Sequence, residues 1–302
     1  MIIKYLKHIE INKNKWNECI AHSFNGLIYS TSVFLDNMAS NWDALVMDDY
    51  AAVMPLPFRK KYGIYYVYPP AFSQQMGITG LQEITPQIIQ AFLRSIPTKF
   101  RYVEMNFNIS NLFEFANAKS RENYILPLVK PCEILKKDFS RSALRNIKKA
   151  NEENISVKEN VAFKEIIKIH RQRFKDKVGA NAADYKRLEK LFTALQESNS
   201  IFTIGAYNRT GTLIGGSIYF VYKNRITFII NGNGDESLKN GATHVLIFYT
   251  IKKFSNQDFI LDFEGSDFVN FVRFYIQYGA TPETYKLVKI NNLPWPFFLL
   301  KK

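Results

Sequence analysis

Cysteine is scarce in this sequence, and its scarcity excludes two kinds of stabilised site. The 302 residues include two cysteines, Cys19 and Cys132, and four histidines. Two cysteines cannot build a disulfide framework or a cysteine-based zinc site, and their wide separation does not suggest a redox pair. We therefore expect no metal centre and a location in the reducing cytoplasm.

Long apolar runs are missing as well. No run approaches the roughly 18 residues that would span a bilayer. The N-terminus lacks the charged, apolar and small-residue succession of a signal peptide. We expect a soluble protein without a transmembrane segment.

Positive charge and aromatic side chains are plentiful. The net charge is +13, 15% of the residues are aromatic and 47% are hydrophobic. The hydrophobic fraction predicts true cores, and the length allows two domains. The charge favours an anionic partner, such as nucleic acid, coenzyme phosphates, nucleotide-linked precursors or lipid headgroups. A functionally neutral, lysine-rich surface explains it equally well.

The second half alternates strands and helices. Apolar periodicity and capping residues predict these elements in order: strand 155–158, a helix from 163, a helix N-capped by Asp184, strands 201–207, 213–222 and 225–231, helix 243–254, strand 259–263, helix 268–278 and strand 284–290.

The first half has a similar order. Its predicted elements are strand 2–6, helices 15–21 and 32–39, strands 42–47, 51–59 and 64–68, a helix capped by Thr85 and Pro86, and strands 100–106 and 123–129. The shared order suggests a tandem duplication, joined at the basic helix 140–151. We predict an α/β (α+β layered) fold with two tandem domains, 1–135 and 136–302, each a mixed, mostly antiparallel sheet flanked by helices.

Three segments resemble those of GNAT-type N-acyltransferases. They are Gly211-Thr-Leu-Ile-Gly-Gly-Ser with the hairpin after it, Asp262-Phe-Glu-Gly-Ser266 followed by Arg273-Phe274 and Gly279-Ala280, and the connection from Asp138 to Ala150. The whole chain is similar to the FemAB-like group, in which two GNAT-like domains lie side by side. The resemblance implies transfer of an acyl group from a thioester donor, acetyl-CoA or a longer acyl-CoA, to a primary amine on a small molecule or peptide.

The same resemblance leaves two alternatives open. FemAB-like transferases that use aminoacyl-tRNA and act on a cell-wall precursor typically have lysine after phenylalanine where this chain has Phe274 and Tyr275. A catalytically inactive homologue that only binds an anion is the other alternative.

Tyr275 lies four residues before Gly279, which is where GNAT enzymes place the tyrosine that protonates the departing thiolate. A phenol with an ordinary pKa near 10 can donate that proton. A core tyrosine on an aromatic helix is the plainer interpretation.

Asp262 and Glu264 are two residues apart on a predicted strand and therefore share a face. Paired carboxylates raise each other's pKa, so one of them can accept a proton from the attacking ammonium. Solvated acids at a strand end are the alternative.

A glycine turn precedes the apolar helix 243–254. Helix starts bind anions through free N–H groups and the helix dipole, so the candidate residues for the donor phosphates are Lys239, Asn240, Gly241, Ala242 and Thr243. The GNAT pyrophosphate pattern [QR]-x-x-G-x-[GA] keeps only Gly241 here, and Asp235 and Glu236 would repel a pyrophosphate. An ordinary capped connection is the alternative, and His244 is a weaker candidate for lining the same site.

Two further groups are candidate substrate-binding residues. Arg141, Arg145 and Lys149 recur at four-residue spacing, so like charges stack on one helical face and an anion would relieve their repulsion. The second group, Tyr68, Gln74 and Gln75, belongs to a polar, aromatic loop region that can cradle the acceptor. A solvated face and a proline-stiffened loop are the respective alternatives. The tail 293–302 is expected to pack on the body or on a second subunit of a homodimer, with a membrane surface as the alternative.

Overall fold

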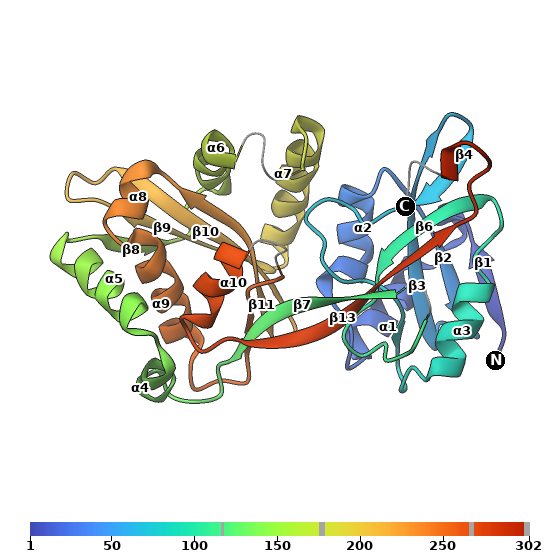
Figure 1. Cartoon of the computed structure of the whole chain (residues 1–302), viewed down its shortest axis with the longest axis horizontal. Coiled ribbons are helices and arrows are strands. Elements are labelled where there is room, and N and C mark those ends of the chain that lie inside the picture. The colour runs from blue at the N-terminus through green and yellow to red at the C-terminus, as the bar shows by residue number, and fades with distance from the viewer. Residues whose placement is uncertain (116–117, 175–178, 266–268, 299–302) are drawn as a thin grey trace. The chain divides into compact units, whose positions relative to one another are not determined.

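The computed structural model describes residues 1–115, 118–174, 179–265 and 269–298, and the chain divides into two compact units (Figure 1). The first unit comprises residues 1–121 and 284–302, and the second comprises 122–283. No helix in the described ranges is long and apolar enough to cross a bilayer. Ser266 and Phe268 of the predicted motif and helix, and tail residues 299–302, lie outside these ranges.

The first unit is built on a sheet with strand order β1-β2-β3-β4-β6-β13, and the short β5 pairs with β3. Neighbouring strands are antiparallel except β4 and β6, which run parallel. The bounds are β1 Ile3–Leu6, β2 Asn41–Met47, β3 Ala52–Lys61, β4 Ile64–Val67, β5 Thr79–Gly80, β6 Phe100–Asn106 and β13 Thr281–Asn291.

Helices cover both faces of this sheet. They are α1 Lys13–His22, α2 Ser32–Met38 and α3 Pro86–Arg94. Trp42 of β2 contacts Trp16 of α1, with ring centroids 5.2 Å apart, whereas Leu45 of β2 packs in one cluster with Phe92 of α3. Residues three apart on a strand point to opposite faces, so α1 and α3 lie on opposite sides. The predicted cap of α3 is confirmed, because the Thr85 hydroxyl accepts from the N–H of Ile88.

The second unit repeats this plan with strand order β7-β12-β11-β10-β9-β8. Here the parallel pair is β11 and β12, and the other neighbours are antiparallel. The bounds are β7 Ala118–Pro127, β8 Ser156–Glu159, β9 Ile201–Tyr207, β10 Leu213–Tyr222, β11 Arg225–Asn233 and β12 Ile260–Asp262. In both units an antiparallel meander is therefore followed by a helical crossover into a parallel strand.

The helices of the second unit are α4 Cys132–Leu135, α5 Arg141–Glu152, α6 Phe163–Phe174, α7 Ala182–Glu197, α8 Asp235–Lys239, α9 Ala242–Phe254 and α10 Val269–Ile276. α6 lies close to one face because Gly216 and Gly232 carry no side chain there; a Cβ at either glycine would come within 3 Å of Ile166. α9 covers the opposite face, where the Thr250 hydroxyl donates to the hydroxyl of Tyr219 on β10 at 3.1 Å. Figure 1 shows α6 and α7 above the sheet and α5, α9 and α10 below it.

The two units exchange their last strands along the chain. β7 follows β6 in the sequence but pairs with β12 of the second unit, whereas the final strand β13 pairs with β6 of the first unit. The expected boundary between residues 135 and 136 thus differs from the observed division, because residues 122–135 belong to the second unit and residues 284–302 to the first.

Two local expectations differ from the structure. Asp184 is not the N-cap of α7: Asn181 caps that helix, and the Asp184 carboxylate accepts from the Asn181 N–H at 3.0 Å in a capping box. α8 was not expected, and it separates β11 from the glycine turn at Gly241. The predicted fold class is confirmed, since each unit is a mixed, mostly antiparallel sheet flanked by helices.

Candidate active site

The parallel strands β11 and β12 separate where the predicted motif lies. Their ladder runs from Arg225 opposite Ile260 to Thr227 opposite Asp262, where β12 ends. β11 continues to Asn233, and within the described residues no strand pairs with that edge beyond Thr227. The β10–β11 register shifts so that Tyr219 pairs with Phe228 and Ile218 with Ile230, which leaves Ile229 in a bulge. β11 therefore has a kinked, unpaired edge after Thr227.

Asn231 lies on this free part of β11, and sequence reasoning missed it. It pairs across the ladder with Ser217, two residues from Tyr219, and so faces α9. Its side-chain Oδ1 is buried and makes no hydrogen bond to any described residue. A buried acceptor without a donor costs about 1–3 kcal/mol, so this oxygen suits an N–H group from a ligand. An isolated asparagine near the end of an apolar strand was the available signal.

Asp262 is held in a buried ion pair. Its Oδ2 lies 2.6 Å from Nη1 of Arg225, and its Oδ1 accepts from the N–H of Glu264 at 2.8 Å. The side chains of Asp262 and Arg225 are 2% and 14% exposed, and Arg225 also pairs with Glu283 at 3.4 Å. Both carboxylate oxygens of Asp262 are thus engaged. This arrangement suits an ionised residue that positions its neighbours, and it does not suit a base that must accept a proton.

Glu264 is the second residue after β12 and is half-buried. Its backbone adopts φ +59°, in the left-handed region that side-chain-bearing residues seldom occupy. Such strained residues are concentrated at functional sites, where the surroundings hold them in place. The backbone carbonyl of Glu264 accepts from the N–H of Tyr124 at 3.2 Å, which ties the segment to β7.

Tyr275 lies on α10, next to these acids. Its ring stacks on Phe263 with centroids 5.0 Å apart, and the residue is 9% exposed. Burial, followed by the negative charges of Glu264 and Asp262, raises the pKa of the Tyr275 hydroxyl above its ordinary value. The structure therefore brings the three predicted catalytic residues together and keeps the phenol protonated, at the edge of an aromatic cluster.

His244 and Tyr278 form a pair beside Tyr275. The Tyr278 hydroxyl lies 2.8 Å from Nδ1 of His244, and the His244 ring makes an edge contact with Phe274. Burial lowers the pKa of His244 to about 4 and raises the pKa of Tyr278 well above 10. The ring is therefore neutral at pH 7 and shares one hydrogen bond with the Tyr278 hydroxyl through Nδ1.

The glycine turn before α9 is largely covered. Gly241 has φ +79°, and a Cβ there would lie 2.2 Å from the carbonyl oxygen of Asn146 on α5. Residues 240–243 are buried, and Lys239 is exposed. Internal bonds engage the polar side chains: the Asn240 Oδ1 accepts from the Ala242 N–H, and Thr243 donates to Asn233. Binding of donor phosphates by Lys239 and residues 240–243 stays a prediction.

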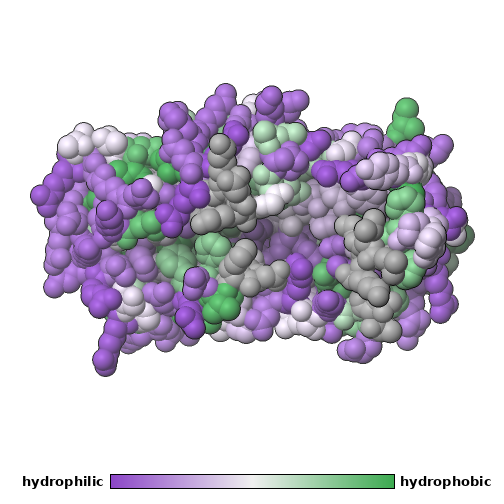
Figure 2. Space-filling model, turned by 45° about the horizontal axis from the view of Figure 1, so that its top comes forward, coloured by the Kyte–Doolittle hydropathy of each residue, from purple (hydrophilic) through white to green (hydrophobic). Residues whose placement is uncertain are grey.

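The basic residues of α5 share an exposed face. Ser140 caps the helix, Ala143 and Ile147 are buried on its inner side, and Arg141, Arg145 and Lys149 are exposed. The end of the molecule that carries α5, at the left of Figure 2, shows mostly hydrophilic residues. The backbone of Asn146, the residue after Arg145, lies against Gly241 at the start of α9. The basic face of α5 therefore adjoins that helix start. Its role in substrate binding remains a prediction.

The three candidate acceptor residues of the first unit have different surroundings. The Tyr68 ring lies under the Arg59 guanidinium, 4.2 Å from the ring centroid, and its hydroxyl accepts from the N–H of Ser40. Gln74 and Gln75 are buried. Gln75 is 1% exposed, and its amide bonds to Gln74 and to the N–H of Ile109. The two glutamines thus hold the loop together, and Tyr68 keeps the more accessible position.

No cluster of three or more His, Cys, Asp or Glu side chains in the described ranges is placed to hold a metal ion. His170, in the apolar stripe of α6, contacts the backbone carbonyl of Asn231 through Nδ1 at 2.9 Å. Burial lowers its pKa, so it is a neutral side chain of the core.

This chain is similar in fold to several proteins of known structure. No protein-family model and no curated protein matches the sequence. Among solved structures, FemX is similar over 100% of both chains, with a TM-score of 0.71 and 12% identity. L-PGS from Bacillus licheniformis is similar over 95% of this chain and 94% of that chain, with a TM-score of 0.58 and 12% identity.

A tandem GNAT protein from the clavulanic acid biosynthesis pathway is similar over 97% of this chain and 99% of that chain, with a TM-score of 0.54 and 9% identity. Identities this low establish the fold alone. The chain therefore has the FemAB-like fold of two tandem GNAT-like units, as the sequence motifs predicted.

Proposed function

We propose that this protein is an N-acyltransferase that moves an acyl group from a thioester donor, an acyl-CoA, to a primary amine on a small molecule or peptide. The observation that carries the proposal is the separation of β11 from β12 after Thr227 and Asp262. The free β11 edge offers backbone N–H and C=O groups, and Asn231 offers a buried acceptor. An acyl-CoA arm, which contains amide groups, can satisfy both.

In the proposed reaction the amine nitrogen attacks the thioester carbonyl. A C–N bond forms, the C–S bond breaks, and the departing thiolate takes the hydroxyl proton of Tyr275. Because its pKa is raised, Tyr275 is protonated at neutral pH and has a proton to donate. Glu264 accepts the proton that the nitrogen loses as the amide forms, and transfer of this proton to the Tyr275 phenolate restores both residues. Asp262 is assigned a positioning role, because Arg225 and the Glu264 N–H engage both of its oxygens.

The donor phosphates are assigned to Lys239 and to the exposed face of Arg141, Arg145 and Lys149. Lys239 is the accessible cation at the start of α9, and α5 adjoins that start through Asn146. Three positive side chains on one helical face attract a polyanion most strongly at low salt.

A second candidate is an aminoacyl-tRNA-dependent transferase that acts on a cell-wall precursor. The observation that favours it is the covered turn at Gly241, where α5 leaves little room for a pyrophosphate. An aminoacyl ester held through tRNA phosphates along the basic face of α5 does not need that turn. In this case Tyr275 would protonate a ribose oxygen instead of a thiolate.

Two measurements separate the candidates. An acyl-CoA at about 100 times its dissociation constant should add about 2.7 kcal/mol to the free energy of unfolding, so acetyl-CoA or a longer acyl-CoA should raise the melting temperature. If no acyl-CoA shifts it, the thioester proposal fails. Charged tRNA that is retained at low salt and released as salt rises would support the second candidate; retention that ignores salt would count against it.

We also propose that the two units arose by tandem duplication. The support is their shared order of a meander, a helical crossover and a parallel strand, β4 to β6 in one unit and β11 to β12 in the other. A cytoplasmic location and a homodimer stay predictions.

A further inference from the structure

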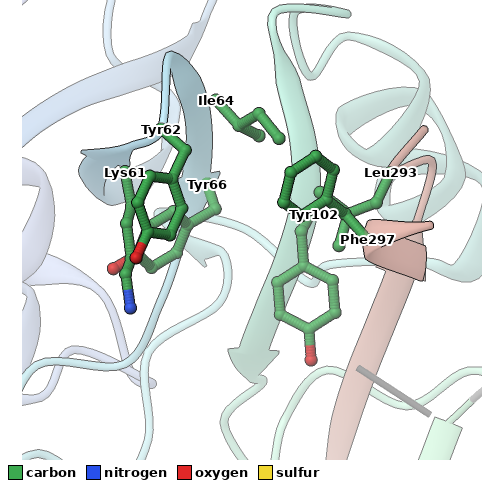
Figure 3. Close-up of a pocket in the computed structure, with 7 residues that line it drawn as sticks. All are labelled: Lys61, Tyr62, Ile64, Tyr66, Tyr102, Leu293 and Phe297. Carbon is green, nitrogen blue, oxygen red and sulfur yellow. The ribbon is translucent and has the colours of Figure 1, made fainter. Parts of the chain in front are cut away.

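The first unit contains a pocket of about 330 Å³ that is separate from the residues assigned to acyl transfer. It lies between the β3–β4 hairpin, β6 and the segment after β13. Its lining residues are Lys61, Tyr62, Ile64, Tyr66, Tyr102, Leu293 and Phe297. In the close-up, Lys61, Tyr62 and Tyr66 stand on one side and Tyr102, Leu293 and Phe297 on the other (Figure 3).

The lining suits a flat, apolar group. Four of the seven side chains are aromatic, and Ile64 and Leu293 add aliphatic surface. Ligand sites are commonly apolar cavities of roughly 300–1,000 Å³ with a few polar groups that fix orientation. A volume at the low end of that range fits one aromatic ring or a fused pair of rings.

The charge of the pocket selects an anion. Lys61 lies at its rim with Nζ 5.3 Å from the centroid of the Tyr62 ring, and no described carboxylate pairs with it. Glu104, whose carboxylate accepts from the hydroxyl of the lining residue Tyr102 at 2.6 Å, is also paired with Lys289 at 3.7 Å. Arg59 and Lys60 precede Lys61 on β3. A cation would therefore be repelled although tyrosine rings are present.

The turn that presents Tyr62 supports a role for its side chain. Tyr62 has φ +50° and Gly63 has φ +78°, so both central residues of the β3–β4 turn are left-handed. Asparagine followed by glycine is the preferred pair in such turns, and a bulky ring is disfavoured at the first position. Tyr62 is also 79% exposed. Strained backbone is concentrated at functional sites, and here it presents an exposed aromatic ring at a pocket rim.

We propose that this pocket binds a small aromatic anion that carries a carboxylate or phosphate group. The ring lies between the Tyr62 and Tyr66 side and the Phe297 side, and the anionic group lies at the Lys61 ammonium. The proposal is independent of the acyl-transfer proposal and stands if that one fails.

The test is calorimetric titration of the full chain with three probes of one shape: 1-naphthoate, the neutral 1-naphthalenemethanol and the cationic 1-naphthylmethylammonium. We expect 1-naphthoate to bind about tenfold more tightly than the neutral probe, and the cation to bind most weakly. Lys61→Gln should weaken 1-naphthoate about tenfold and remove its advantage over the neutral probe. The matched control Lys60→Gln, whose ammonium lies over Tyr65 outside the lining, should change the affinity less than about twofold.

Tyr62→Asn provides a second variant that does not depend on charge. Asparagine fits the turn better, so the melting temperature should stay the same or rise while 1-naphthoate binding falls about tenfold. The proposal is overturned if 1-naphthoate does not bind, if the cation binds as tightly, if Lys60→Gln weakens binding as much as Lys61→Gln, or if Tyr62→Asn leaves the affinity unchanged.

Discussion

The residue that anchors the candidate active site is Arg225, which pairs with the buried Asp262 at 2.6 Å and with Glu283 at 3.4 Å. Removing one partner of a buried ion pair leaves an uncompensated charge and typically costs 3–5 kcal/mol. Glu283 still compensates part of the Arg225 charge in Asp262→Asn, so we predict that this variant lowers the free energy of unfolding by about 2–3 kcal/mol, measured by urea denaturation.

A double variant tests whether this role of Asp262 is structural. Combining Arg225→Met with Asp262→Leu removes both buried charges and should restore part of the lost stability, because Glu283, which loses Arg225, is partly exposed and keeps the Asn123 amide as a donor. If Asp262→Asn has the same free energy of unfolding as the wild type, the ion pair of Arg225 and Asp262 does not hold β11 and β12 together.

His244 makes stability depend on pH. Its pKa is lowered to about 4 by burial, whereas an unfolded histidine titrates near 6.5. Between these values the unfolded chain binds a proton that the folded chain does not, so stability falls as pH drops from 6.5 to 4. We predict that His244→Gln removes about 2 kcal/mol of this loss, a figure reduced for the partial exposure of the ring.

Denaturation curves at several pH values check this prediction, with the exposed His22→Gln as control. Burial also lowers the pKa of His170, so this residue adds to the loss of stability at low pH in the wild type, in His244→Gln and in His22→Gln alike. An unchanged pH slope in His244→Gln would mean that the folded protein protonates this ring as readily as the unfolded chain does, contrary to the effect of its burial.

Among the elements, the start of α9 is closely packed against α5 and gives a matched pair of variants. Gly241 and Gly211 have nearly equal φ angles of +79° and +76°, but a Cβ at Gly241 would meet α5 at 2.2 Å, whereas one at Gly211 would meet nothing within 4 Å. We predict that Gly211→Ala costs about 1 kcal/mol from φ alone and that Gly241→Ala costs about 3 kcal/mol or more. Equal losses in urea denaturation would contradict the contact between α5 and α9.

Elements with regular patterns could be predicted from the sequence. The apolar runs of β9 and β10 and the basic helix predicted at 140–151 have local signals, and the structure confirms these elements, with Ser140 as the cap of α5. The partner of Asp262 could not be predicted, because Arg225 is 37 positions away and the contact depends on the register of β11 with β12. The burial of Gln75 likewise depends on Ile109, which is distant in sequence, so a polar loop was interpreted as a binding surface.

At the scale of the whole molecule, the exchange of final strands determines which piece of chain can fold alone. A fragment of residues 122–283 keeps β7 beside β12, whereas a fragment of 136–302 loses β7 and leaves β12 as an open edge. We predict that 122–283 unfolds cooperatively by circular dichroism and that 136–302, of similar length, aggregates or melts without a transition. The reverse result would mean that the division near residue 135 is the correct one.

The most direct test of the acyl-transfer account is amine-dependent release of free thiol from acyl-CoA by the full chain and its variants. The account predicts that Tyr275→Phe lowers the rate about a hundredfold or more without loss of stability. The control Tyr249→Phe, whose hydroxyl bonds to Glu159 at 2.7 Å, should keep the wild-type rate. Wild-type turnover in Tyr275→Phe would contradict the assignment of that phenol as the proton donor.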